Sequence, residues 1–316
     1  MSAGVQPAPR QFVPTRSQLV VAYSVCRSIT RTAARNFYYA FLVLPRTKRE
    51  ALCAVYAFMR RCDDISDDAC LPVRDRRMKL ADWLDALHNA TAGAPSDDPV
   101  LLALADAQRR YKIPIELLDQ LAAGTAMDLQ LAGEEKDEPE FRPSALSVQY
   151  TTFDDLAQYC YRVASVVGLV CIKIFGYRDP GAEALAERCG LAFQLTNIIR
   201  DVKEDVAMAR VYLPLEDMNQ FGVTVEDLTG APDMVRLRPL LAREADRARE
   251  FYRAGEQLIP LVSEDSQPAL WVLITIYRRL LEKIAAQGYN VFREKVSLTT
   301  SEKVRVLAKG FLKRLA

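Results

Sequence analysis

The sequence predicts an all-helical protein, and two observations lead to this fold class. Apolar residues recur at helical spacing along almost the whole chain of 316 residues. No run of alternating apolar and polar residues between glycine or asparagine turns indicates a β-hairpin. Because 50% of the residues are hydrophobic, the chain can bury one large helical core.

The helix boundaries follow from capping and proline signals. The first predicted helix covers Gln18–Phe41 and ends before a Leu-Pro pair, because proline disfavours helical geometry in the residue before it. Thr47 with Glu50, and Thr152 with Asp155, have capping-box spacing and each precedes a long periodic segment. Further helices are predicted at residues 73–91, 100–111, 114–131, 152–175, 181–209, 232–258, 268–286 and 301–314.

The helices are expected to form one domain. Residues 1–16 contain three prolines and no continuous apolar segment, which predicts a flexible N-terminal tail. The acidic stretch 133–147 is expected to be an exposed loop, because the helices on both sides are apolar enough to share one core. We find no repeat of fixed period, so we expect a single helical domain at residues 17–316.

Composition excludes several classes of function. With 42 Lys+Arg against 41 Asp+Glu, the charge total does not favour nucleic acid as a partner. The chain's one histidine, His88, argues against histidine-rich zinc chemistry and against a Ser-His-Asp catalyst. The seven cysteines form no CxxC pair, and we interpret them as reduced, mostly buried thiols. Without a secretory signal pattern, the protein is expected in the cytoplasm.

A first acidic cluster lies at the end of a predicted helix. In the segment Arg60-Arg-Cys-Asp-Asp-Ile-Ser-Asp-Asp68, Asp63 and Asp67 stack one helical turn apart and Asp64 lies beside them. Four carboxylates in six residues repel one another. Basic partners would relieve that repulsion, as would Mg²⁺, which prefers oxygen ligands. A solvated acidic helix end remains the alternative.

A second polar cluster lies on a helix that is otherwise apolar. Asn197, Asp201 and Asp205 follow i, i+4, i+8 and therefore form one stripe, which Gln194 and Glu204 extend. The residues between them are apolar, so the helix can pack in the core with its polar stripe facing a cavity. Metal and diphosphate would satisfy such a stripe. The alternative is an Arg200–Glu204 ion pair with the remaining side chains in water.

Together the two clusters predict a magnesium-dependent diphosphate site, because facing helices of a bundle can hold metal ions between them. Arg35, Arg60 and Arg200 would help an anionic diphosphate to approach the carboxylates. Loss of diphosphate would leave an allylic cation, which aromatic faces stabilise and an apolar cavity protects from water. The tyrosines on suitable apolar helices are Tyr56, Tyr159, Tyr161 and Tyr277, although core packing is the alternative for Tyr159 and Tyr161.

Six segments of the chain form an ordered set of motifs: Asn36-Phe-Tyr-Tyr-Ala-Phe41, Tyr56-Ala-Phe-Met-Arg60, Asp63-Asp-Ile-Ser-Asp67, Tyr159-Cys-Tyr-Arg-Val-Ala164, Gln194-Leu-Thr-Asn-Ile-Ile-Arg-Asp-Val-Lys-Glu-Asp205 and Arg210-Val-Tyr-Leu-Pro214. They resemble the motifs of the squalene/phytoene synthase family, in order from about Arg35 to Tyr289. The resemblance implies an isoprenoid-synthase-type helical bundle with a central cavity. One departure is the segment Ala34-Arg35-Asn36, where many relatives have a Ser-Lys-Ser or Ser-Arg-Ser sequence.

The resemblance also implies roles for individual residues. The carboxylates would bind a small cluster of Mg²⁺ ions, and basic and polar side chains would hold the substrate diphosphates. We place Tyr161 with the carboxylates among the catalytic residues. By motif position, the metal ligands or their supports are Asp63, Asp67, Asn197, Asp201 and Asp205, and the substrate-binding residues are Arg35, Tyr56, Arg60, Gln194, Arg200, Tyr212 and Tyr277.

The family reaction joins two prenyl diphosphates head to head through a cyclopropylcarbinyl diphosphate. The Phe-Tyr-Tyr-Ala-Phe and Leu-Pro segments are similar to those of bacterial presqualene diphosphate and squalene synthases of hopanoid pathways. Farnesyl diphosphate is therefore the expected substrate, with geranylgeranyl diphosphate and phytoene synthesis as the alternative. NADPH would be needed only if squalene is the final product. A catalytically silent assembly protein of the same family is an alternative of another class.

The last predicted helix suggests a further partner. Basic residues alternate with Val304, Leu307, Phe311 and Leu312 along it. Peripheral membrane contact is one hypothesis, because a hydrocarbon product is insoluble in water, and a plain solvated face is the alternative. The sequence does not predict the oligomeric state.

Overall fold

The computed structural model describes residues 12–33, 35–68, 70–131, 147–229 and 232–315. A π-helical turn at Tyr161–Ser165 joins α7 to α8, and 3₁₀ turns cover Glu226–Leu228 and Ile259–Leu261. The helices are α1 (Arg16–Ala33), α2 (Arg35–Phe41), α3 (Arg46–Ser66), α4 (Val73–Thr91), α5 (Pro99–Tyr111), α6 (Ile115–Leu131), α7 (Phe153–Cys160), α8 (Val166–Phe175), α9 (Gly181–Ala207), α10 (Leu215–Gln220), α11 (Met234–Leu258), α12 (Gln267–Ala286) and α13 (Thr300–Leu315).

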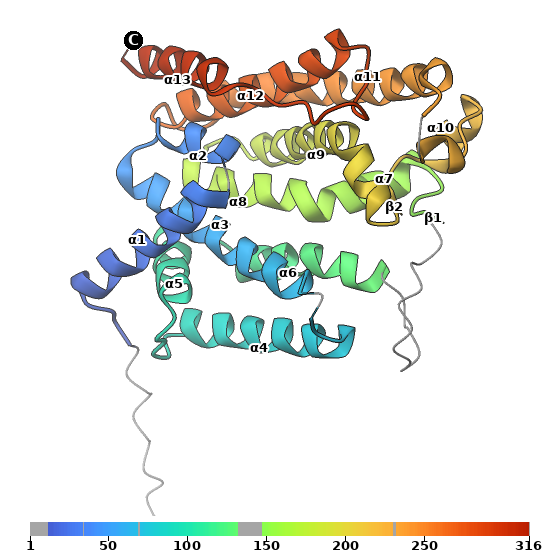
Figure 1. The fold of residues 1–316 in the computed structure, drawn as a ribbon. Coiled ribbons are helices and arrows are strands. Elements are labelled where there is room, and N and C mark those ends of the chain that lie inside the picture. Colours follow the sequence, from blue (N-terminus) through green and yellow to red (C-terminus); the bar gives the residue numbers. More distant parts are fainter. Residues whose placement is uncertain (1–11, 34, 69, 132–146, 230–231, 316) are drawn as a thin grey trace, which may run out of the picture.

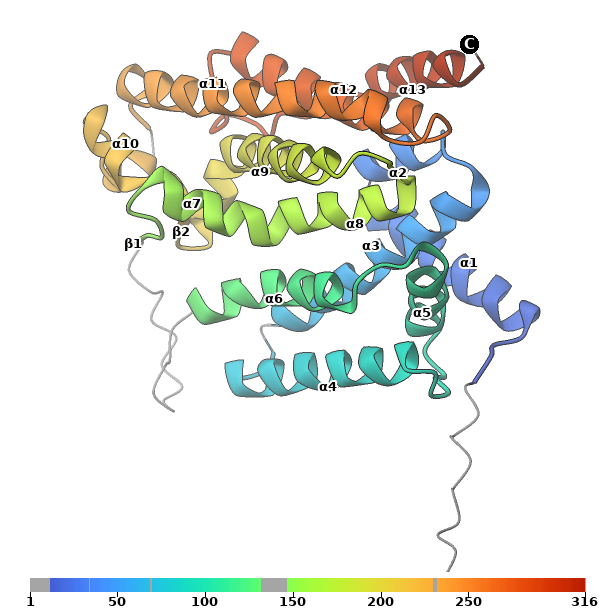
Figure 2. The same cartoon turned by 180° about the vertical axis from the view of Figure 1, so that it is seen from behind.

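The helices stack in layers (Figures 1 and 2). In both views α4 lies at the bottom, α7 and α8 cross the middle, and α11, α12 and α13 form the top. The long helix α9 lies between these layers and packs against α8 and α11. Helices α3 and α9 both run toward the right-hand end of the molecule in Figure 1, so their acidic C-terminal ends lie on the same side. The predicted all-helical bundle is confirmed.

Most predicted helices are present, and the differences have local causes. The helix expected over Gln18–Phe41 is two helices, α1 and α2. The capping box expected at Thr47 is wrong, because α3 begins one residue earlier and Glu50 pairs with Arg46 at 2.8 Å. The second capping box is present, since Thr152 and Asp155 exchange their side-chain and backbone hydrogen bonds.

One short β pairing was not predicted. The strands β1 (Ser147–Val148) and β2 (Arg210–Val211) pair in parallel, with Ser147 opposite Arg210 and Val148 opposite Val211. Two-residue strands are too short for alternating hydrophobicity to reveal them. This pairing ties the beginning of α7 to the segment that follows α9.

The connection between α7 and α8 allows very close packing. A Cβ atom at Gly190 of α9 would lie 2.7 Å from the Ala164 carbonyl oxygen, and one at Gly124 of α6 would lie 2.7 Å from that of Arg162. Both carbonyls belong to the π-helical turn, so α6 and α9 approach it from two sides with glycine at each contact. The sequence predicted one regular helix here, because the change of phase that a π-helical turn causes is hidden in a stretch this rich in apolar residues.

The stretch Phe153–Phe175, which contains α7 and α8, is long and apolar enough to cross a membrane by length and composition. Core helices of folded proteins meet the same criterion, and 50% of its most apolar window is buried. Since α8 contacts both α6 and α9, we interpret this stretch as a core helix.

Several predictions concern residues outside the described ranges. The acidic stretch 133–147 lies outside them except for Ser147, and the N-terminal tail lies outside them as far as residue 11. The described hydrophobic residues form a single core, whereas the expected domain limits stay a prediction. The cysteines are all free and mostly buried, as predicted, with only Cys70 exposed.

A buried ion cluster fastens α10 to α11. Arg247 donates a hydrogen bond to Glu244 at 2.6 Å and binds Asp217 with both terminal nitrogens, one of them at 3.1 Å. The two carboxylate side chains are only 1% and 3% exposed. The Arg247 guanidinium also lies 4.3 Å from the ring centre of Phe153, at the beginning of α7. One cation therefore pairs with two buried carboxylates. Burial and the charge of Asp217 raise the pKa of Glu244 to about 7, although Arg247 lowers that pKa.

We expect Arg247→Ala to lower the free energy of unfolding by roughly 3–5 kcal/mol, because it leaves buried carboxylates without their cation. Denaturant unfolding followed by circular dichroism measures this change. Arg249→Ala, which removes partly exposed pairs with Asp246 and Glu282 on the same helix, is the control and should cost about 1 kcal/mol or less. Equal losses in the two variants would contradict the importance of the buried cluster.

The raised pKa of Glu244 also predicts a pH dependence. The folded protein holds a proton on Glu244 more tightly than the unfolded chain does, so this group's contribution to stability falls as pH rises from about 5 to about 7. The free energy of unfolding of the wild type, measured relative to that of Glu244→Gln, should fall over this interval. Parallel pH profiles for the two proteins would show that Glu244 does not titrate in this range.

Candidate functional site

The first acidic cluster forms the C-terminal end of α3. Asp67 caps the helix, and its backbone N–H donates to the Asp63 carbonyl oxygen at 2.8 Å. The Asp63 side chain is half-buried, whereas Asp64 and Asp67 are exposed. Arg60 pairs with Asp64 at 2.6 Å, with both side chains about half exposed, so this pair contributes little to stability. Arg60 and the carboxylates of this cluster therefore lie side by side at the end of α3.

The second cluster lies on the half-buried side of α9. The predicted apolar side of this helix is confirmed, because Leu195, Ile198 and Ile199 are buried. The side chains on the polar side all keep part of their surface accessible, and these are Gln194, Asn197, Arg200, Asp201, Glu204 and Asp205.

Asp201 is held by two cations. Arg200 donates two hydrogen bonds to its carboxylate, one of them at 2.8 Å from Nε to Oδ1. Lys295, from the loop between α12 and α13, places its Nζ 2.7 Å from Asp201 and 3.5 Å from Glu204. Burial alone would raise the pKa of Asp201, but Arg200 and Lys295 outweigh it and lower that pKa. The sequence alternative of an Arg200–Glu204 pair is therefore not what the structure shows.

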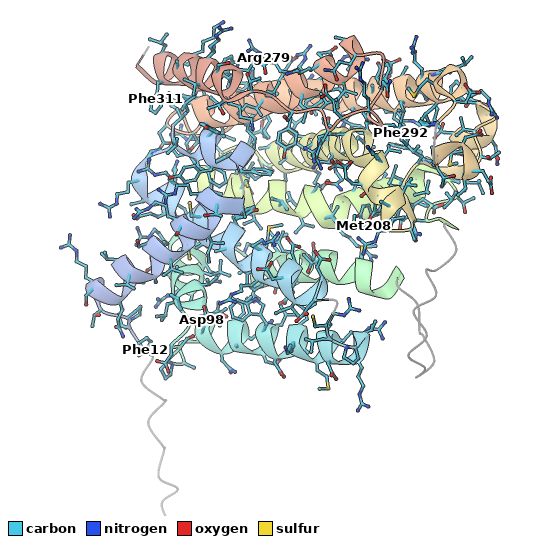
Figure 3. The ribbon with its side chains drawn as sticks, viewed as in Figure 1. Phe12, Asp98, Met208, Arg279, Phe292 and Phe311 are labelled. Atoms are coloured by element: carbon cyan, nitrogen blue, oxygen red, sulfur yellow. The ribbon has the colours of Figure 1, made fainter. Side chains whose placement is uncertain are left out.

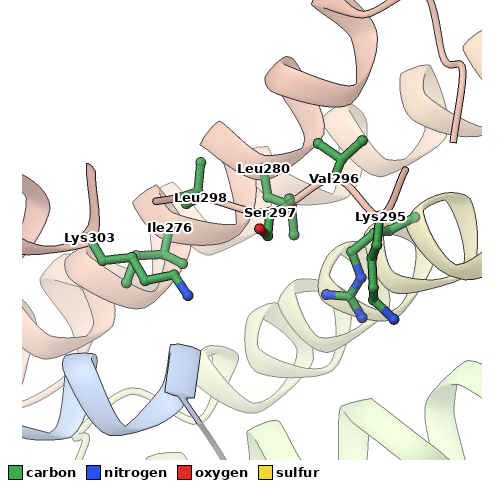
Figure 4. Close-up of a pocket in the computed structure, with 8 residues that line it drawn as sticks. Ile276, Leu280, Lys295, Val296, Ser297, Leu298 and Lys303 are labelled. Carbon is green, nitrogen blue, oxygen red and sulfur yellow. The ribbon is translucent and has the colours of Figure 1, made fainter. Parts of the chain in front are cut away.

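A small basic hollow lies next to this pair (Figure 4). Its volume is about 120 Å³, which is below the size of typical pockets for small organic ligands. Arg200, Lys295 and Lys303 line it together with Ser297 and four aliphatic side chains. Such a hollow suits a phosphate group better than a prenyl chain, because its polar lining is cationic and donates hydrogen bonds.

Tyr277 of α12 lies against the polar stripe of α9. The amide of Asn197 hydrogen-bonds the Tyr277 hydroxyl, and Tyr56 of α3 lies within electrostatic range of it. Burial raises the pKa of Tyr277 to about 12, so the hydroxyl stays protonated near neutral pH. The rings of Phe193 and Phe37 pack against it, with centroids 4.6 and 5.7 Å away. Aromatic faces from three helices therefore lie beside the polar stripe of α9.

Magnesium ligands can be tested against the oxygens of this site. Among the described residues, no group of three His, Cys, Asp or Glu side chains lies close enough to hold a metal ion without movement. Asn197 Oδ1 and Glu204 Oε2 are buried and have no hydrogen-bond partner. Buried oxygens without a donor are costly, and oxygen is the ligand that Mg²⁺ prefers. The stripe on α9 therefore fits a magnesium ion, and Asp63, Asp67, Asn197, Asp201 and Asp205 remain the predicted ligands or supports.

Tyr212, a predicted diphosphate ligand, is buried in a stack of tyrosines. Its ring centre lies 5.1 Å from that of Tyr159 and 6.2 Å from that of Tyr150. Tyr159 is 5% exposed, which agrees with core packing for this residue. The stack lies next to the β pairing that follows α9, so it supports the acidic end of that helix.

Tyr161 lies apart from the acidic residues. It occupies the first position of the π-helical turn, is half-buried, and burial together with the charge of Glu187 raises its pKa. Glu187 precedes Asp201 on α9 by roughly four helical turns. The structure does not bring Tyr161 to the carboxylates, and its catalytic role stays a prediction.

The sequence predicted some of the remaining site residues and missed one of them. Gln194 accepts a hydrogen bond from the Asn197 amide at 3.4 Å, within the predicted stripe. Arg35 begins α2, but its side chain lies outside the described residues. Lys295 was missed because it belongs to a loop with no spacing pattern, 94 residues beyond Asp201 in the sequence. Only the fold brings it to α9.

Comparisons with known proteins place these features in context. The family model for squalene/phytoene synthase matches residues 30–302. The chain is 39% identical to a phytoene synthase of Mycobacterium tuberculosis over 92% of its own length and 91% of that protein. It is 34% identical to a 15-cis-phytoene synthase of Synechococcus elongatus, covering 96% of this chain and 98% of the other.

Solved structures are similar as well. A dehydrosqualene synthase in complex with a ligand superposes with a TM-score of 0.80 at 31% identity, covering 93% of this chain and 96% of the other. Squalene synthase HpnC from Alicyclobacillus acidocaldarius superposes with a TM-score of 0.74 at 29% identity, covering 88% and 97% of the two chains.

The site predicts joint binding of metal and diphosphate. Mg²⁺ with inorganic diphosphate should raise the melting temperature of the wild type, since a ligand at 100 times its Kd stabilises by about 2.7 kcal/mol. Asp201→Asn should abolish most of this shift, because it removes a predicted metal ligand. Asp246→Asn, an exposed carboxylate on α11, is the control and should shift as the wild type does. An unchanged shift in Asp201→Asn would exclude Asp201 from the site.

Proposed function

Because the chain belongs to the squalene/phytoene synthase family, it is a prenyltransferase that condenses two prenyl diphosphates head to head, and we propose that its substrate is geranylgeranyl diphosphate. The product would then be phytoene. This choice reverses the preference for farnesyl diphosphate that the sequence motifs gave.

The observation that carries the proposal is the similarity to phytoene synthases over nearly the whole chain. Relatives of that name from Mycobacterium and Synechococcus match at 39% and 34% identity. The preference for farnesyl diphosphate rests on short segments of α2 and the turn after it, which are a small part of the chain. Chain-length selection depends on the depth of the whole cavity, so similarity over the full length is the better guide.

Farnesyl diphosphate remains the second candidate. It is favoured by the similarity to a dehydrosqualene synthase and to squalene synthase HpnC, at 31% and 29% identity. With this substrate the product would be presqualene diphosphate, or squalene if NADPH supplies the reduction.

Acidic and basic side chains would bind diphosphate in two different ways, the acidic ones through Mg²⁺ and the basic ones directly. Asp63 and Asp67 on α3 and the stripe on α9 would hold Mg²⁺, which when bound supplies positive charge that stabilises the departing diphosphate. Arg200 and Lys295 lie beside Asp201, where they can transfer hydrogen bonds from its carboxylate to diphosphate oxygens. The cations that compensate Asp201 in the free protein would thus also hold the leaving group.

The aromatic cluster around Tyr277 would protect the organic part of the reaction. When the C–O bond breaks, the electron pair leaves with diphosphate and an allylic cation remains for the double bond of the second substrate to attack. The faces of Phe37, Phe193 and Tyr277 can stabilise that cation and exclude water. Apolar side chains that stay half-buried on α3 and α8, such as Met59 and Val167, are available to line the expected cavity. Holding both substrates together supplies the orientation that an encounter in water lacks.

The partners follow from this chemistry. Prenyl diphosphates are the small-molecule partners, and no nucleic acid is expected. We also propose that the protein works in the cytoplasm, in peripheral contact with a membrane that takes up the hydrocarbon product.

Product analysis tests the proposed substrate. Purified protein with Mg²⁺ should convert geranylgeranyl diphosphate to phytoene at a higher kcat/KM than it shows for farnesyl diphosphate, with or without NADPH. Chelation of the metal should stop both reactions. A C30 product formed preferentially would favour the second candidate, and its identity with NADPH would show whether reduction occurs. No product from either substrate would favour the catalytically silent alternative.

A further inference from the structure

Helix α13 has one face fixed to the fold. It contacts α12 and α2, and Val306 on this face is fully buried. Gly310 lies on the same face, where a Cβ atom would come within 2.3 Å of a methyl group of Val272 on α12. The helix therefore has a defined rotation about its axis, because only this glycine-bearing face can approach α12 so closely.

The opposite side of α13 is apolar and exposed. Val304, Phe311 and Leu312 are 47%, 39% and 67% exposed, and Ala308 between them is exposed as well. These positions follow i, i+4, i+7, i+8, so they form one stripe along the helix. Phe311 lies at the outer edge of the molecule, near the C-terminus (Figure 3). A surface helix normally has polar residues on the side away from the core, and this apolar stripe is a departure from that pattern.

Basic residues border the apolar stripe. Arg305 and Lys309 are exposed and lie one helical turn apart along its side. Lys313, a turn further on, lies 5.0 Å from the ring centre of Trp271 on α12. Over its length α13 contains five Lys or Arg residues and one Glu, although the whole chain has a net charge of only +1. The helix thus combines an exposed apolar stripe with a strong local positive charge.

We propose that α13 binds the surface of a membrane that contains anionic lipids, with Val304, Phe311 and Leu312 entering the boundary between headgroups and acyl chains. Apolar area and basic charge on one helix are the two features that produce such binding. The choice of a membrane rests on the proposed function in one respect, since a hydrocarbon product has to leave the protein for an apolar phase.

A second copy of the chain is a poorer occupant of this face. A two-fold symmetric contact through the stripe would place Arg305 and Lys309 of one copy near the same cations of the other. Like charges brought together at an interface oppose association. Anionic headgroups provide the opposite charge along the same border.

Sedimentation with vesicles tests the proposal on the full chain. The wild type should bind vesicles of phosphatidylcholine with phosphatidylglycerol and bind pure phosphatidylcholine much less. Phe311→Ser with Leu312→Ser should lower the bound-to-free ratio by about tenfold or more, because it removes most of the exposed apolar area. Arg305→Glu with Lys309→Glu should lower it by about 30-fold or more at low salt, since each basic residue contributes about fivefold.

Met78→Ser with Val235→Ser is the matched control. These substitutions remove two exposed apolar side chains from α4 and the beginning of α11, and binding should stay at the wild-type level. Circular dichroism confirms that each variant is folded. Wild-type binding by both α13 variants would overturn the proposal, as would equal binding to the two vesicle compositions. The wild type could also form a dimer in the absence of vesicles, and Phe311→Ser with Leu312→Ser could dissociate that dimer. This result would overturn the membrane proposal in favour of self-association.

Catalysis is measured separately, with substrate dispersed in detergent. Product formation without vesicle binding would refute membrane binding by α13 and leave the proposed function unaffected. Vesicle binding without product would refute the proposed function alone.

Discussion

The structure depends on how α9 keeps a polar stripe inside an apolar helix. Asp201 is only 19% exposed, and its charge is balanced by Arg200 from the same helix and Lys295 from a distant loop. A half-buried carboxylate without these cations would be costly. The requirement fixes the position of the loop after α12 and brings that loop to the site. On the same stripe, buried oxygens of Asn197 and Glu204 have no hydrogen-bond donor, which fits the predicted metal site.

Two kinds of support surround this stripe. On one side the aromatic rings around Tyr277 join α2, α9 and α12, and on the other the tyrosine stack of Tyr212 lies against the end of α9. The Arg247 cluster then fastens α10, which follows Tyr212, to α11. Apolar packing and buried charge therefore act on neighbouring elements, and both support the acidic end of α9.

The sequence revealed the features in which residues recur at helical spacing. The apolar side of α9 and its polar stripe follow from helical spacing, as does the one-turn separation of Asp63 and Asp67. Features that depend on tertiary contact had no such signal. Lys295 reaches Asp201 across 94 positions of sequence, and the π-helical turn that separates Tyr161 from Tyr159 changes the helix phase by a local adjustment. Substrate length was harder still, since it depends on the summed shape of many cavity residues, and the similarity over the whole chain reversed the inference from short segments.

We infer that the ends of α3 and α9 together bind metal and diphosphate. The most direct measurement is a crystal structure with Mg²⁺ and an unreactive thio analogue of geranylgeranyl diphosphate. We predict metal ions between Asp63 or Asp67 and the α9 residues Asn197, Asp201 and Asp205, with diphosphate oxygens in contact with Arg200 and Lys295. Diphosphate bound away from both acidic helices, with the Lys295–Asp201 pair intact, would show that these helix ends do not form the site.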